Sequence, residues 1–179
     1  MATTKVDINR APVLTLWAAV VAEALGFEPD EALTLGKTLA GLNAQSKGRR
    51  LGIYKPSEDK AREVRKQPQG ETFWVELLGR PVPALNTPDG LRAASKGEPV
   101  DPGSVQRYLS GKFGPALDDV RAAMEELASA FEPGELEKVA YELYEKFRPE
   151  IPGGKKGWGA KGELNLEYIR SLREEAGAR

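Results

Sequence analysis

Residues 11–45 have the sequence APVLTLWAAVVAEALGFEPDEALTLGKTLAGLNAQ, and this stretch decides the fold. Its first part, residues 11–26, is strongly apolar and predicts a helix, with Pro12 in the first turn and Gly26 at the end. Residues 28–45 predict a second helix, because a proline and two acidic residues stand at its start, where the helix dipole favours negative charge. Since the connection between them is very short, we expect a helical hairpin.

Small residues recur every four positions in the second helix, at Ala32, Gly36 and Ala40. Side chains spaced in this way lie on one side of a helix, so another helix can approach closely there. The stripe and the apolar first helix would also offer a surface to another protein. A protein-interaction or assembly module, or a homo-oligomer, is therefore one function that stays open.

The pattern becomes β-like between the hairpin and residue 85. Residues 49–54 (RRLGIY) predict a short strand, and residues 71–79 (ETFWVELLG) predict another, rich in aromatic and apolar side chains. Residues 80–85 (RPVPAL) contain two prolines, which cannot donate to a sheet ladder, so we expect an edge strand or extended coil. Residues 57–66 are charged on nearly all sides and indicate an exposed helix or a loop. We expect the aromatic residues Trp17, Phe73 and Trp74 to lie in the core.

From Asn86 onward we expect helices again. Thr87-Pro88-Asp89 and Asp101-Pro102 each pair an N-cap residue with a proline at the next position. Residues 115–131 and 133–147 carry apolar side chains at helical spacing, and the stretch that begins at Asn165 predicts a last, exposed helix.

The predicted fold is therefore α+β and mostly helical. It has an N-terminal helical hairpin, a small central antiparallel β element and a C-terminal helical region. The length suits a single compact domain over residues 1–179, which would divide, if at all, into 1–54, 55–85 and 86–179.

The chain contains no cysteine and no histidine. This excludes disulfides, thiolate and imidazole metal sites, and nucleophilic systems that use histidine as the base. Neighbouring carboxylates such as Asp118 with Asp119, or Glu125 with Glu126, point in different directions on a helix and do not converge. We predict no catalytic residue, no metal site and no cofactor, although carboxylates could still hold a hard cation.

The composition, with 40% hydrophobic and 30% charged residues, indicates a globular protein. The sequence has no run of 18 apolar residues, and its first ten residues lack the apolar centre of a signal peptide. We therefore expect a soluble cytoplasmic protein that does not bind membranes.

Charge is unevenly distributed, although the formal net charge of the chain is only −1. Residues 46–66 have eight basic and three acidic side chains, whereas residues 117–146 have three basic and nine acidic ones. Such asymmetry is typical either of two solvated faces or of a surface that binds a polyanion on one side. In the second case the binding side chains of the basic segment include Lys47, Arg49, Arg50 and Tyr54, whose ring could stack on a base.

Residues 151–164 (IPGGKKGWGAKGEL) form a basic, glycine-rich stretch. It is not a P-loop, because Ala160 stands where that motif needs lysine. Glycines allow backbone amides to approach an anion, and Lys155, Lys156 and Trp158 could bind a phosphate or stack on a ring. Alternatively, Trp158 fills the core. A small-anion-binding protein is thus a further alternative.

Residues 100–131 (VDPGSVQRYLSGKFGPALDDVRAAMEELASAF) carry the most specific motif. An apolar residue and an N-cap aspartate come first, and the run RYLSGK follows with a proline and an amphipathic helix after it. This succession resembles the second half of a Cro/C1-type helix-turn-helix. As a whole, the chain also resembles bacterial proteins with no assigned activity, which implies nothing about mechanism.

The helix-turn-helix resemblance implies a recognition helix that begins at Asp101 and exposes Ser104, Gln106 and Arg107, with Lys112 reaching a phosphate. Glutamine can pair with adenine, and arginine with guanine, in the major groove of DNA. The function that we expect first is therefore a non-enzymatic nucleic-acid-binding protein.

Overall fold

The computed structural model describes residues 5–46, 70–95, 97–149 and 161–177. Within these ranges the fold is α+β and mostly helical, as predicted. The strand predicted at 49–54 and the charged segment at 57–66 lie outside the described residues. The helices are α1 (Arg10–Ala24), α2 (Pro29–Ser46), α4 (Pro102–Phe113), α5 (Leu117–Ala128), α6 (Pro133–Phe147) and α7 (Leu166–Gly177), with a 3₁₀ turn η1 (Gly114–Ala116) before α5.

The strands form two antiparallel sheets. The larger one has the order β2-β3-β4-β5, from β2 (Phe73–Leu77), β3 (Arg80–Thr87), β4 (Gly90–Ser95) and β5 (Glu98–Pro99). The smaller one pairs β1 (Lys5–Asn9) with β6 (Lys161–Asn165).

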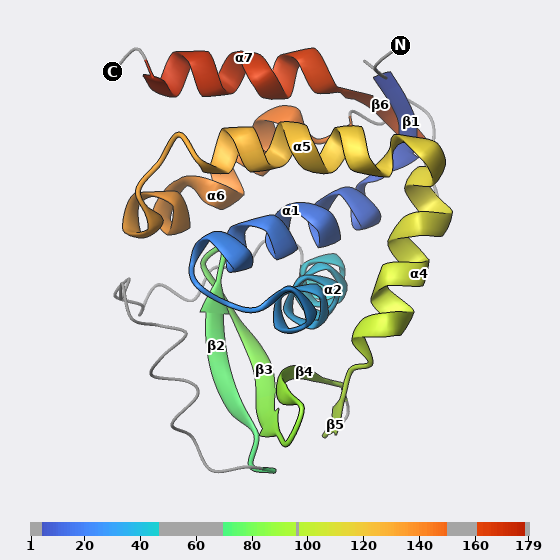
Figure 1. The fold of residues 1–179 in the computed structure, drawn as a ribbon, viewed down its shortest axis with the longest axis vertical. Coiled ribbons are helices and arrows are strands. Elements are labelled where there is room, and N and C mark those ends of the chain that lie inside the picture. Colours follow the sequence, from blue (N-terminus) through green and yellow to red (C-terminus); the bar gives the residue numbers. More distant parts are fainter. Residues whose placement is uncertain (1–4, 47–69, 96, 150–160, 178–179) are drawn as a thin grey trace.

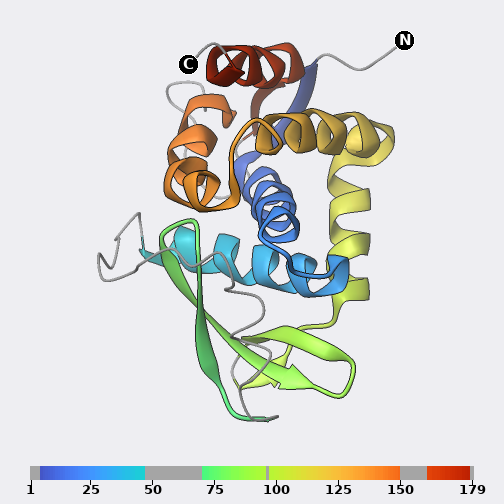
Figure 2. The ribbon, with the colours of Figure 1, turned by 60° about the vertical axis from the view of Figure 1, so that its left-hand side comes forward.

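The elements are stacked in layers along the longest axis of the molecule. From one end to the other, α7 lies on α5 and α6, these lie on α1, and α1 lies on α2, which covers the larger sheet (Figure 1; Figure 2). Helix α4 runs along the side of the stack and connects the level of the sheet with the level of α5 (Figure 2).

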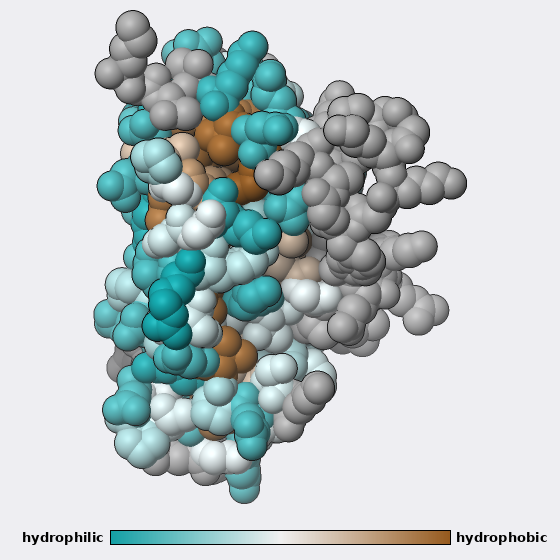
Figure 3. Space-filling model, turned by 90° about the vertical axis from the view of Figure 1, so that its right-hand side faces the viewer, coloured by the Kyte–Doolittle hydropathy of each residue, from teal (hydrophilic) through white to brown (hydrophobic). Residues whose placement is uncertain are grey.

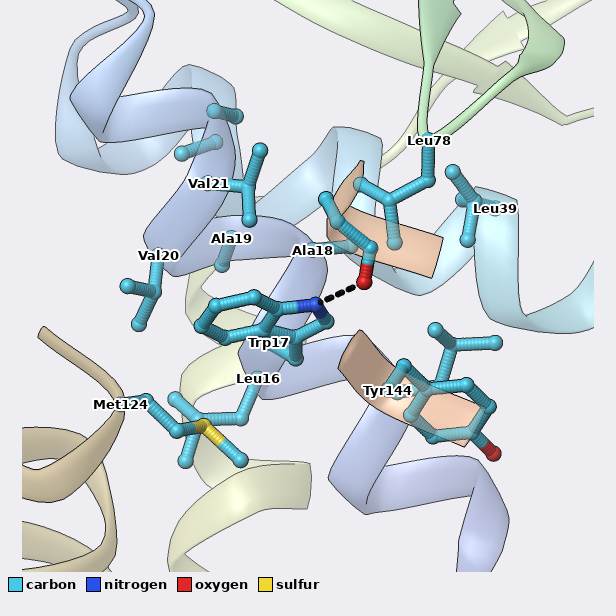
Figure 4. Close-up of a cluster of buried hydrophobic side chains, with 14 of the residues drawn as sticks. Leu16, Trp17, Ala18, Ala19, Val20, Val21, Leu39, Leu78, Met124 and Tyr144 are labelled. Atoms are coloured by element: carbon cyan, nitrogen blue, oxygen red, sulfur yellow. Dashed lines mark hydrogen bonds between the residues drawn. The ribbon is translucent and has the colours of Figure 1, made fainter. Parts of the chain in front are cut away.

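Helix α1 is the centre of the core, because its sequence is apolar on all sides. Every residue from Pro12 to Ala22 is buried. The indole of Trp17 donates to the carbonyl oxygen of Ala140 on α6 at 2.9 Å (Figure 4). It packs edge-on against Phe147, with 5.3 Å between the ring centroids. The core position predicted for Trp17 is confirmed.

The predicted hairpin of α1 and α2 is present, and the small-residue stripe forms its inner face. Ala32, Gly36 and Ala40 are all buried. A Cβ atom on Gly36 would overlap the carbonyl oxygen of Thr15 and lie 3.1 Å from the backbone nitrogen of Ala19. Glycine at this position lets the helices touch, so the stripe packs inside the chain and the prediction that it faces a partner is wrong.

Strand β3 corrects the prediction for residues 80–85, because it pairs with β2 on one side and with β4 on the other. The prolines are tolerated for a local reason. Pro81 and Pro83 lie in the half of β3 that pairs only with β2, since pairing with β4 begins at Ala84. Pairs in an antiparallel ladder alternate between hydrogen-bonded and non-hydrogen-bonded, and after the two-residue β2–β3 turn both prolines fall in non-hydrogen-bonded pairs. Strand β2 therefore needs no N–H donor from either proline.

Strand β2 gives one aromatic residue to the core and exposes the other. Phe73 packs partly buried against the core, whereas Trp74 is 64% exposed, so its predicted core position is wrong. Successive side chains of a strand point to opposite faces, and Val75 and Leu77 share the inner face with Phe73.

The prediction of helices directly after Asn86 is also wrong, because residues 86–99 complete β3 and form β4 and β5. Thr87 does not cap a helix. Its hydroxyl accepts from the backbone nitrogen of Asp89 at 3.2 Å and donates to the carbonyl oxygen of Gly90 at 2.8 Å, which closes the β3–β4 turn.

Helix α2 supplies side-chain partners to one edge of β4. Thr34 accepts a hydrogen bond from the backbone nitrogen of Ala93 at 2.9 Å, and Glu31 accepts one from that of Leu91 at 3.0 Å. The other oxygen of Glu31 accepts from the nitrogen of Glu28 at 2.8 Å, as in a capping box. These two buried side chains thus provide hydrogen-bond acceptors for backbone nitrogens of β4, and Glu31 also provides one for the start of α2.

Strand β1, at the start of the described chain, pairs with β6, which directly precedes the last helix, and Val6 lies opposite Leu164. Strand β6 begins inside the stretch predicted as a glycine-rich loop. Helix α7 is not fully exposed as predicted, since Leu166, Ile169 and Leu172 are buried and the helix packs on α5. Among the described residues, no helix is both long and apolar enough to cross a membrane.

Candidate nucleic-acid interface

Helix α4 forms where the Asp101-Pro102 pair predicts a helix start. The carboxylate of Asp101 accepts from the backbone nitrogen of Gly103 at 3.1 Å, and Pro102 occupies the first helical position. The side chains of Val105, Leu109 and Phe113 are buried and fix the helix against the core. Its opposite side faces solvent and is polar.

All four residues predicted on this helix are exposed: Ser104, Gln106, Arg107 and Lys112. Their contacts are few and lie at the surface. Ser104 donates to the carbonyl oxygen of Asp101 at 2.7 Å, and Gln106 donates to the hydroxyl of Ser110 at 3.3 Å. One guanidinium nitrogen of Arg107 lies 3.7 Å from a carboxylate oxygen of Asp101, and both side chains are more than two-thirds exposed.

The four residues do not all share one line on the helix. With 3.6 residues per turn, Ser104, Tyr108 and Lys112 follow one flank of α4, and Gln106 and Ser110 follow the other. Arg107 lies between the two flanks. A ligand along this side would therefore meet arginine at its centre, lysine on one flank and glutamine on the other.

The remaining seven predicted binding residues lie outside the described residues: Lys47, Arg49, Arg50, Tyr54, Lys155, Lys156 and Trp158. That these seven residues bind nucleic acid stays a prediction.

The elements around α4 match the predicted motif on one side only. Helix α5 follows α4 through η1, in the order that the resemblance implies. Before α4 stand the strands β4 and β5, where the motif would have its first helix. The candidate interface is therefore one helix with an exposed side, and it directly follows the last strand of the larger sheet.

Lys37 and Tyr108 lie beside the predicted residues, and the sequence pattern did not indicate them. The ammonium nitrogen of Lys37, on α2, lies 4.3 Å from the centroid of the Tyr108 ring. Burial raises the pKa of the Tyr108 phenol above its ordinary value. This contact joins residues far apart in the chain, and local spacing carries no signal for it.

The surface over α4 is mainly hydrophilic. Figure 3 shows this side of the molecule, where teal side chains dominate and hydrophobic areas are small and separate. Such a surface suits a charged ligand better than an apolar one.

The described residues offer no grouping of metal ligands, since no three or more aspartates or glutamates gather around a common point. The second pair of carboxylates on α5, Glu125 and Glu126, forms ion pairs instead. Glu125 lies 3.6 Å from Arg121, and Glu126 lies 3.5 Å from Arg170 on α7. Arg121 also pairs with Glu23 of α1.

An open hollow of about 300 Å³ lies at the start of α2, beside the β3–β4 turn. Two of its polar lining residues, Glu31 and Arg92, already have partners within the fold. Arg92 donates to the carbonyl oxygens of Leu91 and Asp89 at 2.8 and 3.3 Å, and both carboxylate oxygens of Glu31 accept backbone hydrogen bonds. Arg92 thus braces the β3–β4 hairpin, and Glu31 joins that hairpin to the start of α2.

No protein-family model matches the chain, and neither a curated protein nor a solved structure matches it. Any proposal about the function therefore rests on the geometry of the structure, and above all on that of α4.

Proposed function

We propose that this chain is a non-enzymatic nucleic-acid-binding protein that uses the exposed side of α4. The observation that carries the proposal is the exposure of three residues of α4, with Arg107 at the centre of the solvent-facing side and Gln106 and Lys112 on its opposite flanks. Arginine and lysine neutralise phosphates, and glutamine and arginine can pair with base edges.

The ion pair between Arg107 and Asp101 does not prevent Arg107 from binding a nucleic acid. Exposed pairs of this kind contribute about 0–1 kcal/mol, so a phosphate or a base edge can replace Asp101 at little cost. The helix itself is fixed by its buried side, so binding would not require it to be ordered first.

The test is fluorescence anisotropy of labelled duplex and single-stranded oligonucleotides, from low to physiological salt. We expect binding that weakens steeply with salt, because each neutralised phosphate releases counterions. In the double variant Arg107→Gln and Lys112→Gln, affinity should fall, and the slope of log K against log salt should decrease by about two.

The matched control is the double variant Lys146→Gln and Arg173→Gln, which removes one lysine and one arginine from exposed positions of α6 and α7. It changes the net charge equally and should leave the salt slope as it is. No binding by the unaltered protein at low salt, or equal losses in both double variants, would end the proposal.

A protein-interaction module is the second candidate, favoured by the exposed indole of Trp74 on β2, one of the two edge strands of the described sheet. Tryptophan is enriched among the residues that dominate protein interfaces. Light scattering that finds a strict monomer at all concentrations would count against self-association through this strand. The small-anion alternative depends on Lys155, Lys156 and Trp158, which are not among the described residues.

A further inference from the structure

Lys37 is a basic residue of α2 that lies beside the exposed side of α4. Helix α2 packs against α4, and the ammonium group of Lys37 lies over the ring of Tyr108. Because its ring meets Lys37, Tyr108 lies on the flank of α4 that faces α2, and Lys112 follows one helical turn later on the same flank. The fold thereby brings Lys37 to the same flank as Lys112.

The contact with Tyr108 restricts an otherwise mobile side chain. A lysine that binds a ligand normally loses much rotamer freedom, and a cation held over an aromatic ring has lost part of it already. Val105 and Leu109, close to Tyr108 on the same helix, are buried in the core, so the backbone that carries the ring is held in place. The position of the positive charge is thus set before any ligand arrives.

Neither Lys37 nor Lys112 forms an ion pair with a carboxylate of the described residues. Their charges are therefore not neutralised by those acidic groups. The ammonium group occupies one face of the Tyr108 ring, so a base cannot stack on that face. A phosphate oxygen, which needs only the positive charge, can approach it.

We infer that Lys37, positioned by Tyr108, is a phosphate-contacting residue, so that the nucleic-acid interface extends from α4 onto α2. This inference rests on the proposed function. Gln106 and Arg107 would then read bases, while Lys37 and Lys112 would hold the backbone of the same nucleic acid along one flank.

The experiment measures anisotropy with two labelled duplexes of unrelated sequence across a salt series, with the full chain. In Lys37→Gln we expect affinity to fall several-fold for both duplexes alike, and the salt slope to decrease by about one. The control Lys138→Gln removes an exposed lysine of α6 and should change neither quantity.

A second pair of variants tests the role of the ring. Tyr108→Phe keeps the aromatic face and should bind as the unaltered protein does. Tyr108→Leu removes the face, so affinity should fall while the salt slope stays the same, because no charge is lost.

The outcomes separate the two proposals. If the unaltered protein binds and Arg107→Gln weakens binding, but Lys37→Gln matches the Lys138→Gln control, only the extension onto α2 is overturned. The same holds if Tyr108→Leu binds like Tyr108→Phe. If the unaltered protein does not bind either duplex at low salt, both the proposed function and the extension are overturned.

Discussion

The hydroxyl group of Thr34 shows how one buried polar atom holds a helix to a strand. Thr34 is fully buried, donates to the carbonyl oxygen of Glu31 at 2.9 Å, and accepts from the backbone nitrogen of Ala93. The Thr34 hydroxyl thus provides the hydrogen-bond acceptor for the backbone nitrogen of Ala93. Burying such a nitrogen without an acceptor is costly, which gives the threonine its importance.

We expect Thr34→Val, which keeps the shape and removes the acceptor, to lower the free energy of unfolding by about 1–3 kcal/mol. Urea unfolding would measure this, and faster hydrogen exchange at the Ala93 amide would locate it. Thr38→Val, one turn later on α2 and half-buried, is the control and should change stability by about 0.5 kcal/mol or less. A Thr34→Val protein as stable as the control would contradict the role of this hydrogen bond.

At the scale of elements, local pattern predicts the helices well and the sheet only in part. The apolar run of α1 and the proline with acidic residues at the start of α2 are local signals, and both helices form where predicted. The sequence after Asn86 is ambiguous, because Thr-Pro-Asp suits a helix start and a turn equally. Hydrogen bonds from backbone nitrogens of β4 to the side chains of Glu31 and Thr34 favour the strand, and both acceptors belong to α2.

The same limit applies to the candidate site. The exposure of Ser104, Gln106, Arg107 and Lys112 follows from the spacing of Val105, Leu109 and Phe113, so the sequence predicts it. The contact between Lys37 and Tyr108 requires α2 and α4 to lie side by side, and no local pattern indicates that. Likewise, β-like composition indicates a strand at Trp74 but does not show which face the core takes.

The packing of α1 on α2 can be tested with two glycines of one helix. Gly36→Ala should destabilise the protein by about 1–3 kcal/mol, because the new methyl group meets backbone atoms of α1 that cannot turn aside. Gly41→Ala, where nothing lies within 4 Å of the new atom, should stabilise it by about 0.5–1 kcal/mol through helix propensity. Thermal unfolding of the two variants should therefore shift in opposite directions. A shift of the same sign in both would mean that the helices separate easily.

For the whole molecule, one hydrophobic cluster includes residues from nearly every layer, from Val75 in the sheet to Ile169 in α7. A continuous core of this kind predicts that the described chain unfolds as one cooperative unit rather than along the boundaries at 54/55 and 85/86. The second of these boundaries would cut strand β3.

Ile169→Ala tests this cooperativity from one end of the stack. Ile169 is fully buried, so its truncation should cost about 2–5 kcal/mol, whereas Arg173→Ala at an exposed position of α7 should cost about 0.5 kcal/mol or less. If the molecule is one unit, hydrogen exchange under native conditions should show this loss also at the amide of Val75, in the sheet at the opposite end. Protection of Val75 that stays unchanged while α7 loses protection would mean that the sheet and α2 unfold separately from the layers above α1.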